Sequence, residues 1–223
     1  MLYFRGCTAR EKQTGIARAT EELLTLAGID YHILEDEKCC GSVLLRTGFE
    51  KEAQKQIEKN TDLLKSEKII TSCAGCYKTL KEDYKGLNVI HISQLLDELI
   101  RDNRLNPVKQ DLNVTYHDSC HLARHCNVFD EPRKVIESAA NLVEMENNHQ
   151  ESLCCGAGGG VKSAYPSIAS QMAKSRISQA RATGCKTLVT ACPFCRLNLE
   201  NDEFEVIDLT EFLIKYGGLN EGK

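Results

Sequence analysis

Several features are absent from this 223-residue sequence. It has no tryptophan, no block of lysine and arginine, and a formal net charge of −4, so its composition gives no indication of a nucleic-acid partner. No apolar run approaches the roughly 18 residues that span a bilayer, so any membrane link is expected to come through a partner. Residues 1–5 lack the apolar segment of a secretion signal, and we therefore expect a cytoplasmic protein.

Cysteine, by contrast, is abundant, with twelve residues. Ten of them form one five-cysteine pattern that occurs twice, each time with an adjacent pair followed by glycine and with a final Cys-x-x-Cys. The copies consist of Cys7, Cys39, Cys40, Cys73 and Cys76, and of Cys120, Cys154, Cys155, Cys192 and Cys195. In a reducing cytoplasm this density indicates metal binding or redox chemistry more than structural disulfides. Cys126 and Cys185 fall outside the pattern and are expected to be buried, inert thiols.

The repeat extends beyond the cysteines and predicts two domains. The segment 89–93, Val-Ile-His-Ile-Ser, matches 206–210, Val-Ile-Asp-Leu-Thr. A repeat of about 115 residues is a duplicated domain rather than a solenoid unit. The polar, proline-containing segment 103–113 is the predicted junction, which places one domain at 1–105 and the other at 106–223.

Short apolar segments alternate with helical patterns in each half. Strands are predicted at 2–4, 68–71, 114–116 and 186–190, and helices at 14–27 and 166–183. This alternation predicts an α/β fold with mainly parallel, Rossmann-like sheets. Each Cys-x-x-Cys directly follows a strand, at the sheet edge where open α/β folds bind ligands. Helices are predicted to begin near Tyr77 and Arg196, which would aim N–H groups at the thiolates and lower their pKa values.

Thiolates are soft ligands, so the two cysteine sets allow three kinds of chemistry. Five thiolates exceed the four that one zinc ion takes, and adjacent cysteines reach one tetrahedral zinc only with strain. Adjacent cysteines can, however, ligate different irons of a cluster. The common ferredoxin spacing is absent. The pattern therefore favours iron–sulfur clusters, with zinc, in one copy or in both, and free redox thiols as the alternatives.

The double pattern resembles the CCG domain family. Its best-known members are the catalytic subunits of CoB–CoM heterodisulfide reductase, namely the stand-alone B-type subunit and the C-terminal part of the D-type subunit. The resemblance covers nearly the whole chain, and three segments read like the D-type sequence: 116–122, 153–160 and 188–195. The chain is also similar to the iron–sulfur subunits of glycolate and lactate oxidation systems.

The resemblance implies two CCG domains related by a pseudo-twofold axis. Each would hold one noncubane [4Fe-4S] cluster on its own five cysteines, and the two clusters would face each other across a substrate disulfide. The expected reaction is reduction of CoM-S-S-CoB to CoM-SH and CoB-SH. The sequence contains no cubane-cluster motif, so electrons are expected from a ferredoxin-like cubane-cluster subunit and a larger hydrogenase, formate dehydrogenase or flavin module.

Five further residues are candidates for the substrate site. His121 follows a ligand cysteine and could protonate a departing thiolate, with a structural histidine as the alternative. Gly158 and Gly159 belong to a glycine run that fails the dinucleotide fingerprint; they are expected to let the backbone approach cluster and substrate. Arg46 and Arg124 could pair with an anionic substrate tail, or lie solvated at the surface. Two other histidines lie near cysteines in sequence, and three carry no signal: His117 and His125, then His32, His91 and His149.

Two other functions remain open from the sequence. The chain could be a non-catalytic electron-transfer subunit of a glycolate, lactate or dicarboxylate oxidoreductase, or a zinc-stabilised interaction module. Both five-cysteine sets are intact here, which favours disulfide reduction over plain electron transfer.

Overall fold

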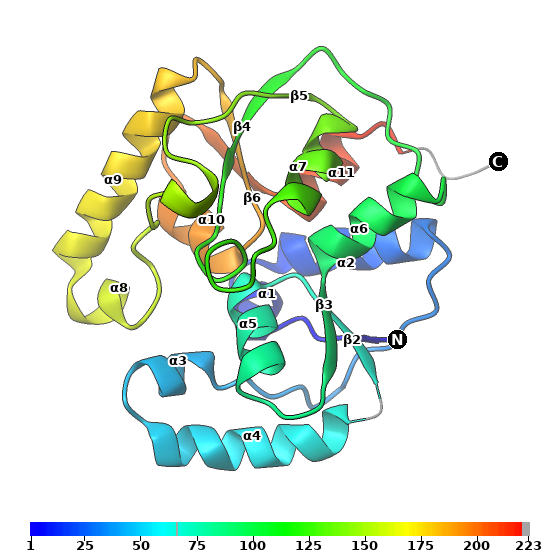
Figure 1. Ribbon diagram of the computed structural model, residues 1–223, viewed down its shortest axis with the longest axis vertical. Coiled ribbons are helices and arrows are strands. Elements are labelled where there is room, and N and C mark those ends of the chain that lie inside the picture. The colour runs from blue at the N-terminus through cyan, green and yellow to red at the C-terminus, as the bar shows by residue number, and fades with distance from the viewer. Residues whose placement is uncertain (66, 220–223) are drawn as a thin grey trace.

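The protein is built around two parallel sheets, which Figure 1 shows in the computed structural model of residues 1–65 and 67–219. The first sheet has the order β1-β2-β3, with strands at Leu2–Tyr3, Lys68–Thr71 and Asn88–His91. The second has the order β5-β4-β6-β7, with β4 at Asn113–His117, β5 at Asn141–Leu142, β6 at Thr187–Thr190 and β7 at Glu205–Asp208. The strand pairs in both sheets are parallel, which confirms the predicted α/β fold.

The two sheets repeat one plan. In each, the strand that leads to the first cysteine pairs with the strand that leads to the Cys-x-x-Cys, and a third strand follows on the far side. The second sheet adds β5 beside β4. In the first sheet the corresponding place holds only a single bridge between Leu2 and His32.

The helices follow the same duplication. The first half contains α1 (Cys7–Glu11), α2 (Thr14–Leu26), α3 (Ser42–Arg46), α4 (Glu50–Leu64), α5 (Ala74–Glu82) and α6 (Ile92–Arg101). The second contains α7 (Asp130–Glu137), a short 3-10 turn (His149–Glu151), α8 (Val161–Ala164), α9 (Pro166–Ala182), α10 (Pro193–Leu199) and α11 (Leu209–Tyr216). No helix within these described residues combines the length and apolar character needed to cross a bilayer.

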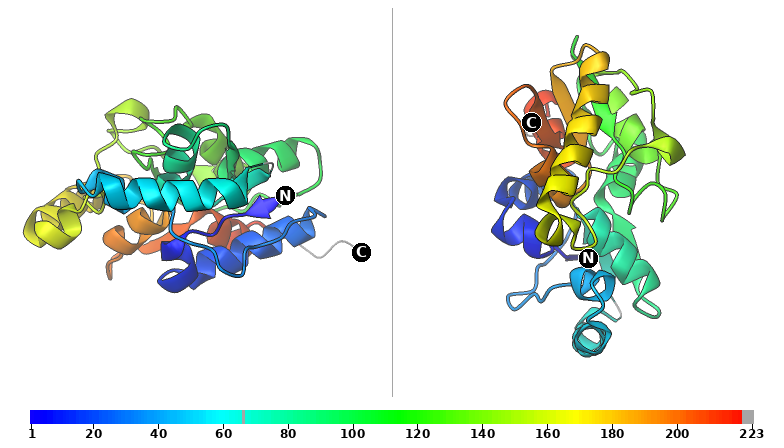
Figure 2. Two further views of the ribbon diagram at one scale, coloured as in Figure 1. Left: turned by 90° about the horizontal axis from the view of Figure 1, so that it is seen from below. Right: turned by 90° about the vertical axis from the view of Figure 1, so that its left-hand side faces the viewer.

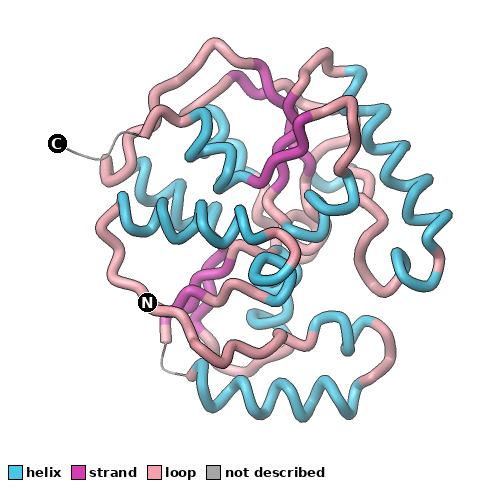
Figure 3. The backbone as a smooth tube through the Cα atoms, turned by 180° about the vertical axis from the view of Figure 1, so that it is seen from behind, coloured by secondary structure: helices cyan, strands magenta, loops and turns pink. Residues whose placement is uncertain are grey.

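Four helices join the halves, as Figures 1 and 3 show. Helix α6 of the first half packs on α7 of the second, and α11 of the second packs on α2 of the first, so the contacts are exchanged as a pseudo-twofold axis requires. Their buried faces form one apolar core that residues from both halves share. Helix α4 lies on the outside of the first sheet, where Figure 2 shows it from below, and it contributes Ile57 and Leu64 to a smaller apolar cluster.

Most predicted elements are found within a residue or two of their expected bounds, but the two cysteine helices begin earlier than predicted. Helix α5 starts at Ala74 and α10 at Pro193, so Cys73 and Cys192 are their N-caps. Proline fits the first helical position because its φ is already helical and it has no N–H to satisfy. Residues 106–112 connect the halves without a regular element. The boundary between residues 105 and 106 stays a prediction.

Candidate metal centre

The cysteines lie at the carboxyl ends of the parallel strands. Cys7 follows β1 and Cys120 follows β4, while Cys73 and Cys192 follow the central strands β2 and β6. The second cysteine of each Cys-x-x-Cys lies in the first turn of its helix. Unpaired N–H groups and the positive end of the helix dipole stabilise thiolates at such places.

A glycine in the left-handed region follows each adjacent cysteine pair. Gly41 has φ 83° and Gly156 has φ 85°, a conformation that strains any other residue. In the second half this turn places the N–H of Gly156 3.3 Å from the sulfur of Cys154. The Cys-Cys-Gly unit therefore needs its glycine to turn the backbone toward the thiols.

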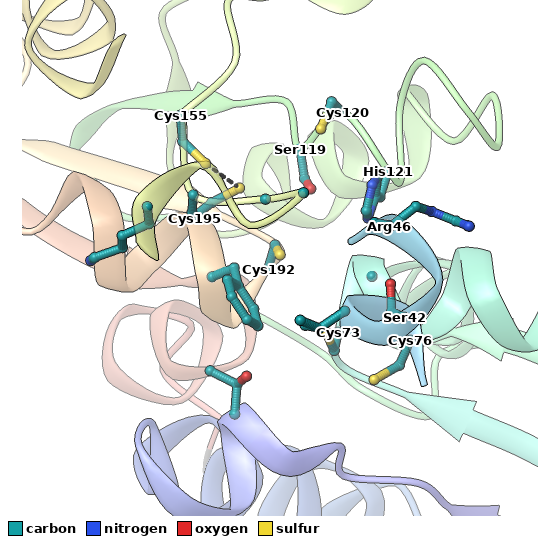
Figure 4. A pocket seen from close by; sticks show the side chains of 18 of the residues that line it. Ser42, Arg46, Cys73, Cys76, Ser119, Cys120, His121, Cys155, Cys192 and Cys195 are labelled. Carbon is teal, nitrogen blue, oxygen red and sulfur yellow. Dashed lines mark hydrogen bonds between the residues drawn. The ribbon is translucent and has the colours of Figure 1, made fainter. Parts of the chain in front are cut away.

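All ten patterned cysteines line a single cavity of about 260 Å³, which Figure 4 shows from close by. Three sulfur pairs are close: Cys40–Cys76 at 3.4 Å, Cys155–Cys195 at 3.4 Å and Cys7–Cys39 at 3.7 Å. None of them is a disulfide. Two thiolates on one tetrahedral metal ion lie about 3.8 Å apart, since each metal–sulfur bond is about 2.3 Å. The spacing therefore suits thiolates that share metal ions.

The thiols perturb one another's pKa values in opposite directions. Contacts with Cys39 and Cys76 lower the pKa of Cys40, while contacts with Cys40 and Cys73 raise the pKa of Cys76. The second half repeats this: Cys195 and then Cys73 lower the pKa of Cys192, and the hydroxyl of Ser119 adds to that effect. Neighbouring thiols at this density cannot all ionise without cations to balance them. Bound metal supplies such cations, so the donor set fits an iron–sulfur cluster in each half.

Behind the second set lies a buried histidine–arginine pair. A ring nitrogen of His117 and the sulfurs of Cys155 and Cys195 lie within 4.8 Å of one another. Arg176 is fully buried and its Nε donates to His117 Nδ1 at 3.0 Å. Burial lowers the pKa of His117 to about 3 and that of Arg176 to about 10, so at neutral pH the ring is neutral and the guanidinium is charged.

Ion pairs hold the loops that carry the first cysteine of each set. In the second half, Arg133 makes a bidentate pair with Asp118 at 2.7 and 2.9 Å, and it also contacts Glu144 at 2.6 Å. In the first half, Glu37 accepts the N–H groups of Arg5 and Gly6, each at 2.9 Å. These contacts fix the backbone just before Cys7 and Cys120.

The structure brings most of the other candidate residues to the cavity. Its lining includes His121, Arg46, Gly158 and Gly159, and Figure 4 shows His121 beside Arg46. A Cβ added at either glycine would meet nothing within 4 Å, so the backbone there faces open space. Arg124 instead donates to the carbonyl of Ser152, next to the second cysteine pair.

Two features of this region were not expected from the sequence. Lys162 lines the cavity from α8 and adds a second cation to Arg46. His91, which carried no signal, is fully buried at the end of β3, where its ring caps α6 as Asp208 caps α11. The repeat could have indicated this, because His91 and Asp208 occupy matching positions. Cys185 is buried as expected, whereas Cys126 is only half-buried.

Comparison with known proteins agrees with this geometry. A family model described as the cysteine-rich domain, CCG, matches residues 1–81 and 114–200, which contain both cysteine sets. The chain belongs to the CCG cysteine-rich domain family. This confirms the resemblance seen in the sequence.

Its curated relatives are oxidoreductase subunits. The D-type subunit of the dihydromethanophenazine:CoB–CoM heterodisulfide reductase of Methanosarcina acetivorans is 41% identical over 216 residues, 89% of this chain and 53% of that protein. The B-type subunit of the CoM/CoB fumarate reductase of Methanothermobacter marburgensis is 38% identical over 89% of this chain and 41% of that protein. The EtfAB:quinone oxidoreductase of Syntrophomonas wolfei is 32% identical over 87% of this chain and 30% of that protein. The CCG chain thus spans about half the length of the first and less of the others.

Proposed function

We propose that this CCG protein is an iron–sulfur redox subunit that reduces a small disulfide, with CoM-S-S-CoB as its leading substrate. One observation carries the proposal: both five-cysteine sets line the same cavity. A disulfide has two sulfurs, and a cavity with one thiolate set on each side can act on both. The relative at 41% identity, named as a heterodisulfide reductase subunit, supports this choice of substrate.

The proposed cofactors are two noncubane [4Fe-4S] clusters, one on each cysteine set. When bound, such clusters exchange single electrons, which allows a two-electron cleavage to be divided into one-electron steps. In total, CoM-S-S-CoB takes up two electrons and two protons and yields CoM-SH and CoB-SH. The cysteines hold the clusters, and the walls of the cavity keep the disulfide between them.

Other residues of the cavity would bind and protonate the substrate. His121 carries its proton beside the thiolates, where burial lowers its pKa and the charge of Cys192 raises it. Arg46, held by Asp83 at 2.8 Å, and Lys162 offer cationic groups to an anionic tail. Gly158 and Gly159 leave room for the substrate to approach the backbone.

Electrons would come from a partner subunit that carries cubane clusters, in the cytoplasm. The division into domains 1–105 and 106–223 is part of the same proposal, because each unit would then hold one cluster. A hydrogenase, formate dehydrogenase or flavin module would be the ultimate source of electrons.

A second candidate function is electron transfer without disulfide chemistry. The relative named as an EtfAB:quinone oxidoreductase favours it, because that protein matches the same part of the chain. In this role the two cysteine sets would pass electrons onward, and the cavity would hold no disulfide.

The decisive experiment uses protein purified without oxygen and then oxidised. Adding CoM-S-S-CoB is expected to produce a new paramagnetic signal by EPR, and the variant Cys155→Ser is expected to abolish it. Cys185→Ser is the matched control, since Cys185 lies outside the cavity lining. Iron-loaded protein that gives no response to the disulfide would favour electron transfer instead. If His121→Gln kept full disulfide reduction, the proton-donor role would be excluded.

A further inference from the structure

The two cysteine sets differ at one matching position behind their thiols. Phe4 stands three residues before Cys7, as His117 does before Cys120. Phe4 packs in an apolar cluster that includes Cys40 and Cys76. His117 takes the equivalent place beside Cys155 and Cys195, so a polar ring replaces an apolar one.

The tautomer of His117 follows from its neighbour. An arginine can only donate hydrogen bonds, so the nitrogen that faces Arg176 Nε, Nδ1, must be an acceptor. In the neutral ring the hydrogen is therefore on Nε2. This nitrogen is buried and finds no hydrogen-bond partner among residues 1–65 and 67–219.

The same contact argues against His117 as a metal ligand. A ligating histidine usually donates its other ring N–H to a neighbour. Here the other nitrogen accepts from Arg176, which leaves Nε2 as a donor and not as a ligand. A buried N–H close to two thiols instead suits a hydrogen bond to one of them.

Arg176 adds a positive charge at the same place. It is fully buried, and its hydrogen bonds go to His117, to the Tyr116 and Asn147 carbonyls and to Gln179, with no carboxylate partner within the described residues. A buried cation is costly unless an anion balances it. The thiolates beyond His117 are the anions that this position faces.

A second difference points the same way. Ser119, whose hydroxyl hydrogen-bonds Cys192, stands where the first half has Gly6. In the first half, the hydroxyl of Thr8 reaches Cys7 only at 4.0 Å. The remaining charges near the two sets occur as ion pairs of both signs.

We infer that His117 donates its Nε2 hydrogen to a ligand thiolate of the second set and, with Arg176 behind it, makes the second site the more easily reduced of the two. This inference rests on the proposed function, because it needs a cluster at each set. Hydrogen bonds to cluster sulfurs and nearby positive charge stabilise the extra negative charge of the reduced state. Electrons from the donor would therefore collect in the second half first, and His117 is a positioning residue for that order.

The test is a redox titration of the intact chain, monitored by EPR, with dithionite as the electron donor and no disulfide present. Two one-electron couples are expected in the unmodified protein. His117→Phe copies the first half, and it is expected to move the more positive couple to lower potential by at least tenfold in its equilibrium, which is about 59 mV. The more negative couple should stay in place.

Two further variants keep the test decisive. His117→Gln retains an acceptor for Arg176 and a donor for the thiolate, so it should restore most of the shift. Arg176→Met removes the cation and replaces H117F if that variant loads no iron; it too should lower the more positive couple. His32→Phe, at an exposed histidine, is the control that should change neither. A shift in the more negative couple alone, or none, would overturn the inference.

A measurement on metal-free protein separates this inference from the proposed function. A long-range proton–nitrogen correlation spectrum should show His117 protonated at Nε2, and protonation at Nδ1 would contradict the assigned tautomer. A chain that binds no iron would refute the clusters and leave the tautomer testable. A chain with both clusters and unmoved couples in H117F would refute the inference and leave the proposed function standing.

Discussion

The two halves of this CCG protein hold the same cysteine frame with opposite charges. In the first half, the acid is Glu37 on the segment before the cysteine pair, and it holds arginines on the loop after β1 and on α1. In the second half, the acid is Asp118 on the loop after β4, and Arg133 holds it from α7. The halves share the strand ends, the left-handed glycine and the helix N-terminus. Ligand geometry is therefore set by the backbone, and the ion pairs that support it can be exchanged.

The largest expected effect comes from removing one ligand in either half. Cys40→Ser and Cys155→Ser each take one thiol from a close sulfur pair, so each is expected to lose the metal of its own half, about half of the bound iron. Iron and acid-labile sulfide analysis measures this. If either variant lost all the iron, the two sites would not be independent.

Breaking the two supporting ion pairs should cost different amounts of stability. Asp118→Asn leaves Arg133 buried with only the half-buried Glu144 as its anionic partner, and such a loss costs about 3–5 kcal/mol. Glu37→Gln keeps an acceptor for the Arg5 and Gly6 N–H groups and should cost about 1–2 kcal/mol. Urea unfolding of metal-free protein compares them. Equal losses would show that the charges are not the difference between the halves.

The two left-handed glycines should also differ in their tolerance of alanine. Both changes carry the strain of positive φ, about 1–2 kcal/mol. A Cβ at Gly156 would also lie 2.9 Å from the carbonyl oxygen of Ala169, whereas at Gly41 the nearest atom is 4.0 Å away. We expect Gly156→Ala to cost roughly 1–3 kcal/mol more than Gly41→Ala. Thermal unfolding with iron content measures both changes, and a larger loss in G41A would be the wrong order.

The smallest expected effect is a pair of opposite pH dependences at the matching caps. Burial raises the pKa of Asp208 to about 8, so the folded state binds the extra proton and stability falls as pH rises from about 4 to 8. Burial lowers the pKa of His91 to about 4, so stability falls as pH drops from 6.5 toward 4.

Metal-free D208N and H91N test this pair. Relative to the unmodified chain, Asp208→Asn should gain stability between about pH 5 and 8, and His91→Asn should gain it below about pH 6.5. Each slope should stay under about 1.4 kcal/mol per pH unit, the limit for one proton. Parallel slopes for the two variants would mean that the caps do not differ in this way.

The sequence predicts the frame of this protein well, because the frame is local. The strand 68–71 is found as predicted, and the Cys-x-x-Cys follows it at the sheet edge. The spacing of the cysteines therefore implied their meeting in one place. The starts of α5 and α10 were predicted three residues late, because a cysteine N-cap leaves a weaker signal than serine or aspartate.

The parts that could not be predicted depend on distant contacts. His117 lies near Cys120 in sequence, but its role depends on Arg176, which α9 brings to it from 59 positions away. The same holds for Arg133, which reaches Asp118 from α7. Neither arginine belongs to a motif, and only the packing of helices on the second sheet shows which polar groups they contact.

The most direct test of paired iron–sulfur sites is the metal content of the intact chain after purification without oxygen. We predict about eight irons and about eight acid-labile sulfides per chain, shared equally between the two cysteine sets. A colourless protein that holds zinc, or a chain with about four irons, would contradict the claim that both sets bind iron–sulfur clusters around one cavity.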